Sequence, residues 1–88
     1  MRNRADKNQD EIVKGLRAIG ATVEVLSQVG HSCPDILCGW RGQNYLMEIK
    51  DKHGKLSESQ KAWHTFWNGQ VAVVRNLAEA VRVLESGT

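Results

Sequence analysis

A short glycine turn between two apolar segments constrains the fold of this chain more than any other sequence feature. The turn is Arg41-Gly42, and the segments on either side, residues 34–40 and 43–50, are rich in Ile, Leu, Trp and Tyr. Glycine readily adopts the positive φ that a tight hairpin needs. The pattern therefore predicts a β-hairpin centred on this turn.

The register of that hairpin brings charged residues together. Pairing of Trp40 with Gln43 beside the turn continues, residue by residue, to a pairing of Asp35 with Glu48. Because side chains alternate between the two faces of a strand, Glu48 and Lys50 point the same way and Asp35 joins them. Two facing carboxylates repel each other, and either a divalent cation or the Lys50 ammonium can offset that repulsion. The cluster is suited to metal-assisted hydrolysis of phosphodiesters, with Lys50 positioning water or stabilising developing charge.

The spacing of Pro34-Asp35 and Glu48-Ile49-Lys50 resembles the PD-(D/E)xK nuclease superfamily. Downstream, residues 54–63 continue with a basic loop, a Leu-Ser pair and a Gln-x-x-Trp sequence. This succession is similar to the small stand-alone VRR-NUC domains found in phages. The resemblance covers about residues 8–84, which is nearly the whole chain.

The resemblance implies both an activity and an assembly. The activity is that of an endodeoxyribonuclease dependent on Mg²⁺ or Mn²⁺. In it Asp35 and Glu48 bind the metal, the Ile49 carbonyl completes the metal shell, and Lys50 is the catalytic cation. Similar stand-alone domains act as dimers that resemble Holliday-junction resolvases. One protomer of 88 residues offers a single site, so we expect a homodimer that cuts branched DNA such as a four-way junction.

A first helix is expected over residues 8–19, with a start that is open by one turn. On its helical wheel Gln9 falls inside the apolar face, between Ile12 and Val13. Nucleases of the superfamily often place an acid from the first helix into the metal site. Gln9 is therefore either a neutral site residue that orients a metal-bound water or a helix-terminal polar residue.

A second helix begins after Ser57, which forms a capping box with Gln60. That spacing indicates a purely structural role for Gln60 as part of the helix cap. The family resemblance instead places a glutamine beside the acidic pair, which would make Gln60 a site residue. Trp63, Phe66 and Trp67 are the largest apolar groups of this helix, and we expect them in the core rather than as platforms for base stacking.

Basic and imidazole side chains follow the acidic cluster. Lys52, His53 and Lys55 lie where a phosphate backbone would pass, so we expect them to contact DNA, although a net charge of +2 does not by itself indicate nucleic-acid binding. His31 is either a solvated loop residue or a site residue that contacts phosphate or transfers a proton.

The remaining segments predict an α/β fold. Residues 21–26 form a strand, and residues 70–75 hold a continuous apolar run typical of a strand covered on both faces. Asn76 caps a last helix. Residues 1–88 thus form one domain with the order α-β-β-β-α-β-α, a mixed four-stranded sheet and the restriction-endonuclease-like layout.

Composition excludes several classes. The longest apolar runs are too short for a membrane span, and residues 1–4 lack the apolar region of a secretory signal, so we expect a cytoplasmic protein without a membrane partner. Cys33 and Cys38 lack the paired spacing of a zinc site and are expected to be reduced thiols.

Two other functions are compatible with the sequence. One is a non-catalytic DNA-binding module that keeps the nuclease fold, for which Gln9 in place of an acid is the best support. The other is a small dimeric interaction protein in which Glu48 and Lys50 form an exposed ion pair. The second leaves the facing of Asp35 and Glu48 unexplained.

Overall fold

The computed structural model describes residues 4–87, and its elements follow the expected order. The strands form one mixed sheet in the order β1-β2-β3-β4, with antiparallel pairs β1–β2 and β2–β3 and a parallel pair β3–β4. The predicted α/β class and the central hairpin are confirmed. The elements are α1 (Arg4–Ala18), β1 (Thr22–Val25), β2 (Ile36–Trp40), β3 (Gln43–Ile49), α2 (Glu58–Phe66), β4 (Val71–Val74) and α3 (Leu77–Ser86).

The hairpin between β2 and β3 has the predicted turn and register. Arg41 and Gly42 both adopt positive φ, at 50° and 80°, which is the combination that a two-residue type I′ turn requires. Trp40 pairs with Gln43, and the pairing continues without a slip towards the start of β2. This register sets which side chains of β3 share a face.

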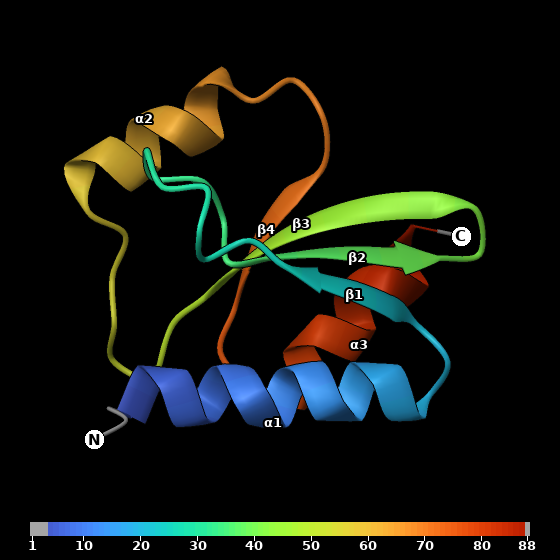
Figure 1. Ribbon diagram of the computed structural model, residues 1–88. Helices are drawn as coiled ribbons and strands as arrows, with labels where there is room; N and C mark the ends of the chain where they lie inside the picture. The colour runs from blue at the N-terminus through green and yellow to red at the C-terminus, as the bar shows by residue number, and fades with distance from the viewer. Residues whose placement is uncertain (1–3, 88) are drawn as a thin grey trace.

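The sheet separates two unequal layers (Figure 1). Helices α1 and α3 pack side by side on one face and enclose the core with alternate residues of the strands, whereas α2 lies on the opposite side, which we call the outer face. No helix within residues 4–87 is long and apolar enough to cross a membrane. The core contains Ile12, Val13, Leu16, Ala21, Val23, Ile36, Cys38, Tyr45, Met47, Ile49, Val74, Ala80 and Leu84.

Two element predictions need correction. Helix α1 begins at Arg4, about one turn before the predicted start at residue 8, so Asn8 is an interior helix residue. Strand β4 is an edge strand of the sheet, and its residues 71–73 are only half-buried. A continuous apolar run therefore did not mean a strand enclosed on both sides.

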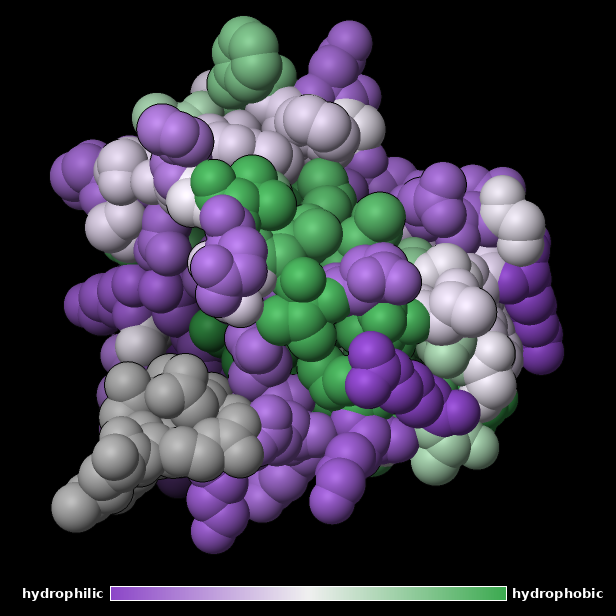
Figure 2. Space-filling model, viewed as in Figure 1, coloured by the Kyte–Doolittle hydropathy of each residue, from purple (hydrophilic) through white to green (hydrophobic). Residues whose placement is uncertain are grey.

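The aromatic residues of α2 do not form the core that the sequence suggested. Helix α2 contains no buried residue, and the exposed fraction is 83% for Phe66 and 41% for Trp67. The reason is topological, because α1 and α3 already fill the face of the sheet that encloses the core. On the side shown in Figure 2, hydrophobic side chains also remain visible over the sheet between α1 and α2, and the exposed fraction of Val29 is 54%.

Candidate active site

Asp35 lies one residue before β2 and is held by both neighbouring strands. Its N–H donates to the Met47 carbonyl at 3.1 Å, and its own carbonyl accepts the Leu26 N–H at 2.8 Å. One carboxylate oxygen, Oδ2, accepts the Ile49 N–H at 2.7 Å. Strand β2 begins only at the next residue, so it offers no backbone partner to the Ile49 N–H at the end of β3. The Asp35 side chain supplies that partner instead. The carboxylate is thereby fixed in place.

Glu48 on β3 is a buried carboxyl group with an exposed fraction of 3%. Its Oε2 accepts a hydrogen bond from Gln60 Nε2 at 3.3 Å and lies 3.7 Å from Lys50 Nζ. Its Oε1 is buried and has no hydrogen-bond partner among residues 4–87. Burial and, next, the adjacent Asp35 carboxyl raise the pKa of Glu48 from 4.5 to about 8, although Lys50 opposes the shift. Without a cation nearby, the group is mostly protonated at neutral pH.

Gln60 makes both of the contacts that its position in the sequence suggested. Its Oε1 accepts the Ser57 N–H at 2.9 Å, and its own N–H donates to Ser57 Oγ at 3.2 Å, which completes the capping box of α2. Its amide nitrogen remains available and donates to Glu48. The same side chain therefore starts the helix and holds one oxygen of the buried acid.

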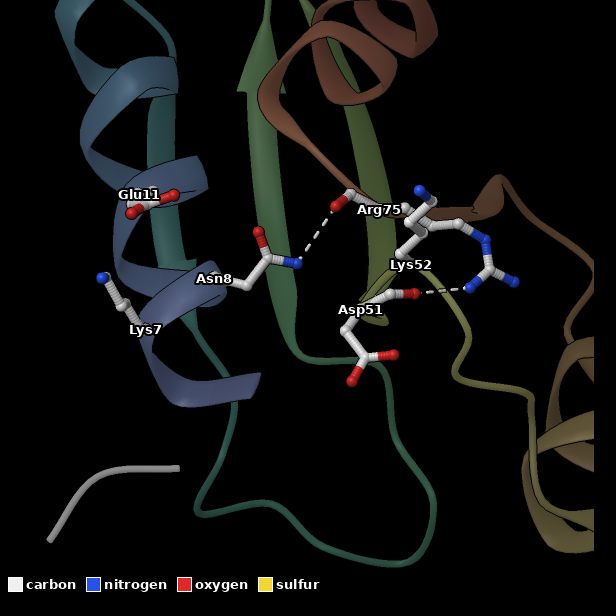
Figure 3. A pocket seen from close by; sticks show the side chains of 6 residues that line it. All are labelled: Lys7, Asn8, Glu11, Asp51, Lys52 and Arg75. Atoms are coloured by element: carbon white, nitrogen blue, oxygen red, sulfur yellow. Dashed lines mark hydrogen bonds between the residues drawn. The ribbon is translucent and has the colours of Figure 1, made fainter. Parts of the chain in front are cut away.

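Lys50 is anchored through its backbone, and Asn8 is part of the anchor. The Lys50 N–H donates to the Val74 carbonyl at 3.0 Å, and its carbonyl accepts Asn8 Nδ2 at 3.1 Å. Asn8 Nδ2 also donates to the Arg75 carbonyl at 3.1 Å (Figure 3). Asn8 thus ties α1 to the ends of β3 and β4. The sequence did not single out Asn8 for this role, for which the only signal was its position one turn before Ile12.

A small pocket of about 220 Å³ opens beside this anchor, between α1 and the ends of β3 and β4 (Figure 3). Arg75 Nη1 donates to the carbonyls of Asp51 and Gly54, each at 2.7 Å, and so holds the loop that follows Lys50. The residues lining the pocket carry both signs of charge. They are Lys7, Asn8, Glu11, Asp51, Lys52 and Arg75.

The other predicted site residues make no hydrogen bond or ion pair to the two carboxylates within residues 4–87. Gln9 is half-buried and makes no hydrogen bond to either carboxylate within the described part of the chain. His31, His53 and Lys55 are exposed, as is Lys52, so each is accessible to a large ligand. Their roles stay predictions.

Two further residues lie close to the cluster and were not singled out from the sequence. His64 follows Gln60 by one helical turn, and its Nε2 is buried without a partner among residues 4–87. Burial and then the charge of Lys50 lower the pKa of His64, so the ring is neutral near pH 7. Cys33 is a free thiol, as expected, and its pKa is raised by burial and then by the two carboxylates. The i, i+4 spacing from Gln60 is the signal that would have indicated His64.

The donor set fits a hard divalent cation. Within residues 4–87 no group of three or more His, Cys, Asp or Glu side chains could hold a metal ion, so the site offers two carboxylates. Mg²⁺ commonly binds through one or two carboxylates and completes its shell with waters and substrate phosphates. The buried, unpartnered Oε1 of Glu48 beside Asp35 is the feature that such an ion would satisfy. The role predicted for the carbonyl of Ile49, the residue between Glu48 and Lys50, stays a prediction.

A solved structure described as a VRR_NUC domain has the same fold as this chain. The two align with a TM-score of 0.77 and 24% sequence identity, and the match covers 96% of this chain and 97% of that chain. No protein-family model matches the sequence, and no curated protein matches it either. The structural match confirms the restriction-endonuclease-like fold that the order of helices and strands predicted.

Proposed function

We propose that this protein is an endodeoxyribonuclease that hydrolyses DNA phosphodiesters with the help of Mg²⁺ or Mn²⁺. The observation that carries the proposal is the Glu48 carboxyl group, buried beside Asp35 with one oxygen lacking a partner. Burying such a group without full hydrogen bonding costs free energy. A scaffold gains nothing from that cost, whereas a bound cation would offset it.

In this proposal Asp35, Glu48 and the Ile49 carbonyl hold the metal. When bound, the ion would neutralise phosphate charge and increase the acidity of a coordinated water. Gln60 holds Oε2 of Glu48 through its amide nitrogen, so Oε1 remains the oxygen available to the cation. The hydrogen bond from the Ile49 N–H leaves the second oxygen of Asp35 for the same purpose.

Lys50 supplies the positive charge of the site. Its ammonium lies 3.7 Å from Glu48 Oε2, and the exposed fraction of its side chain is 19%. Partial removal from water strengthens its interaction with a phosphate. Lys50 can therefore orient the attacking water or stabilise charge that develops on the phosphoryl oxygens. Gln9, on α1, is proposed as a second group that orients water.

The DNA backbone is proposed to lie over the exposed basic residues next to the carboxylates. Lys52, His53 and Lys55 follow Lys50 directly in sequence, and His31 lies in the loop before Asp35. Such contacts position the duplex without reading its sequence. Their contribution to affinity should fall steeply with salt concentration.

We further propose that the active form is a homodimer that cuts branched DNA, with a four-way junction as the preferred substrate. The support is the apolar surface that the monomer leaves uncovered. Phe66 is exposed on α2 and Val29 in the loop before β2. On α3 the exposed fraction of Leu77 is 37%, whereas Leu84 is fully buried in the core of the same chain.

A non-catalytic DNA-binding module is the second candidate. It is favoured by the lack of a third acidic ligand within the described residues and by a glutamine, Gln9, on the first helix. It predicts tight DNA binding with no metal-dependent cleavage.

One experiment separates these candidates. Labelled duplex, flap and four-way junction DNA are incubated with the protein, with and without Mg²⁺ or Mn²⁺. Asp35→Asn and Glu48→Gln should each reduce metal-dependent cleavage by at least about 100-fold, whereas Glu58→Gln, at an exposed position that pairs with Lys61, should not. Binding without cleavage would support the non-catalytic module. Cleavage that survives both site substitutions would exclude the proposed centre.

A further inference from the structure

A groove without charged side chains runs along the outer face of the sheet next to the candidate site. Leu46 precedes Glu48 by two residues on β3, so the two side chains share this face, and Leu46 pairs with Leu37 on β2. The cavity measures about 480 Å³, which lies in the range of about 300–1,000 Å³ typical of small-ligand sites. Leu37 and Leu46 line it on the strands, Trp67 and Gln70 line it after α2, and Asn44 lies near the hairpin turn.

The indole of Trp67 is held at the wall of this groove. It stacks on Trp63 with ring centroids 4.8 Å apart and an interplanar angle of 15°, and it remains 41% exposed. Gly69 leaves room for the ring, since a Cβ at that position would come within 2.9 Å of Trp67 Nε1. No residue of α2 is buried, so the two rings do not serve the hydrophobic core.

Amide groups border the same groove. Gln70 Nε2 donates to the Asn44 carbonyl at 3.0 Å, which fixes the Gln70 side chain across the gap between β3 and the segment before β4. The Asn44 side chain is exposed on the outer face. Side-chain amides both donate and accept, which is the combination that the edge of a nucleobase presents.

We propose that this groove binds one unpaired nucleobase of the DNA strand that is cut, an inference that rests on the proposed nuclease function. The surface on the two sides of Glu48 differs in charge. Lys50 and Lys52 follow Glu48 in the sequence, whereas the groove, whose β3 residues precede Glu48, has no charged side chain. Phosphates belong on the basic side, and a flat, neutral ring that stacks on an aromatic side chain belongs in the groove.

The separation of the two sites defines the substrate class. Two residues along a strand span about 7 Å, so a base that contacts Leu46 belongs to a nucleotide next to the phosphate held at Glu48. A base inside a duplex is stacked and paired, and reaching the groove would cost its unstacking. Among branched DNA molecules, four-way junctions included, the groove therefore selects a cut next to a nucleotide that is unpaired, as in a flap or at the branch point. A second copy of this chain is a poorer occupant, because Phe66, the most exposed apolar side chain of α2, does not line the groove.

The test combines a change in the protein with a change in the DNA. Binding is measured in EDTA, so that nothing is cut, for a duplex with a short single-stranded flap and for the same duplex with an abasic flap of equal length and charge. The wild-type protein should prefer the intact flap by about tenfold, the effect expected for one stacked base. Trp67→Ala should remove this preference, Trp67→Phe should retain most of it, and Phe66→Ala should leave it in place. If Trp67→Ala does not fold, Asn44→Asp, which adds a carboxylate at an exposed position, should reduce the preference instead.

Equal affinity of the wild-type protein for both flaps would overturn the proposal, as would a preference that survives Trp67→Ala in a folded protein. So would a change in sedimentation on Trp67→Ala without a change in the flap preference, which would identify the groove as a contact between protomers. Cleavage of the same flap with Mg²⁺ by the wild type and by Asp35→Asn tests the nuclease function separately. Normal metal-dependent cleavage without base-dependent binding refutes the groove alone. Absence of cleavage refutes the nuclease function, whatever the flap preference.

Discussion

Replacing Glu48 with glutamine removes a carboxyl group whose ionisation the fold opposes. Burial, followed by the Asp35 carboxyl, raises its pKa from 4.5 to about 8 in the folded chain. Between these two values the folded chain binds more protons than the unfolded chain, so stability falls as the pH rises through this window. The loss reaches up to about 5 kcal/mol above pH 8, since each pKa unit corresponds to about 1.4 kcal/mol. That is a large share of the roughly 5–15 kcal/mol that stabilises a typical domain.

The Glu48→Gln variant keeps the shape of the side chain and an oxygen that can accept from Gln60, but it cannot ionise. Urea unfolding of the wild type and the variant in EDTA, from about pH 5 to about pH 9, reports on Glu48 together with the neighbours that its charge affects, because titrations elsewhere are common to both chains. The two proteins should have similar stability near pH 5. Near pH 9 the variant should be more stable by several kcal/mol.

Glu58→Gln is the matched control, since Glu58 pairs with Lys61 at a largely exposed position on α2. Its effect should stay within about 1 kcal/mol and should not follow the pH. If the difference between the wild type and Glu48→Gln is the same at every pH, Glu48 is not the strained acid described above. Mg²⁺ should narrow the difference at high pH, because it stabilises the ionised carboxylate of the wild type alone.

The other predictions concern catalysis, DNA binding, the hairpin and assembly. Lys50→Ala should lower the cleavage rate far more than it lowers DNA affinity. Lys52→Ala should lower DNA affinity and reduce the slope of its salt dependence by about one. If the two variants have equal effects on rate and affinity, Lys50 has no special role. Gly42→Ala, which forces a side chain onto a φ of 80°, should cost about 1–2 kcal/mol in thermal unfolding, and an unchanged melting temperature would contradict the type I′ turn. The wild type should sediment as a dimer at micromolar concentration and should dissociate, with loss of junction cleavage, on dilution towards nanomolar concentration. The Phe66→Ser variant should dimerise less well. A monomer of undiminished activity would exclude the two-site mechanism.

Local sequence determined the hairpin and the helix caps. Arg41-Gly42 determined the position of the turn, which depends on neighbouring residues alone. The alternation of side chains along β3 determined which residues share a face with Glu48, because it depends only on the register of the hairpin. Ser57 and Asn76 cap α2 and α3 as expected, since their side chains bond to backbone donors three residues on. The facing of Asp35 and Glu48 could be predicted because it depends on the same hairpin register.

Only the tertiary structure decided how those groups behave. The burial that raises the pKa of Glu48, the bond from Gln60 to its Oε2 and the anchoring of Lys50 by Asn8 all join segments that are distant in sequence. The exposure of Phe66 followed from which face of the sheet α1 and α3 occupy, and hydrophobicity alone cannot predict that choice. Local patterns report what a residue can do, whereas desolvation and long-range contacts depend on the packing of the whole chain.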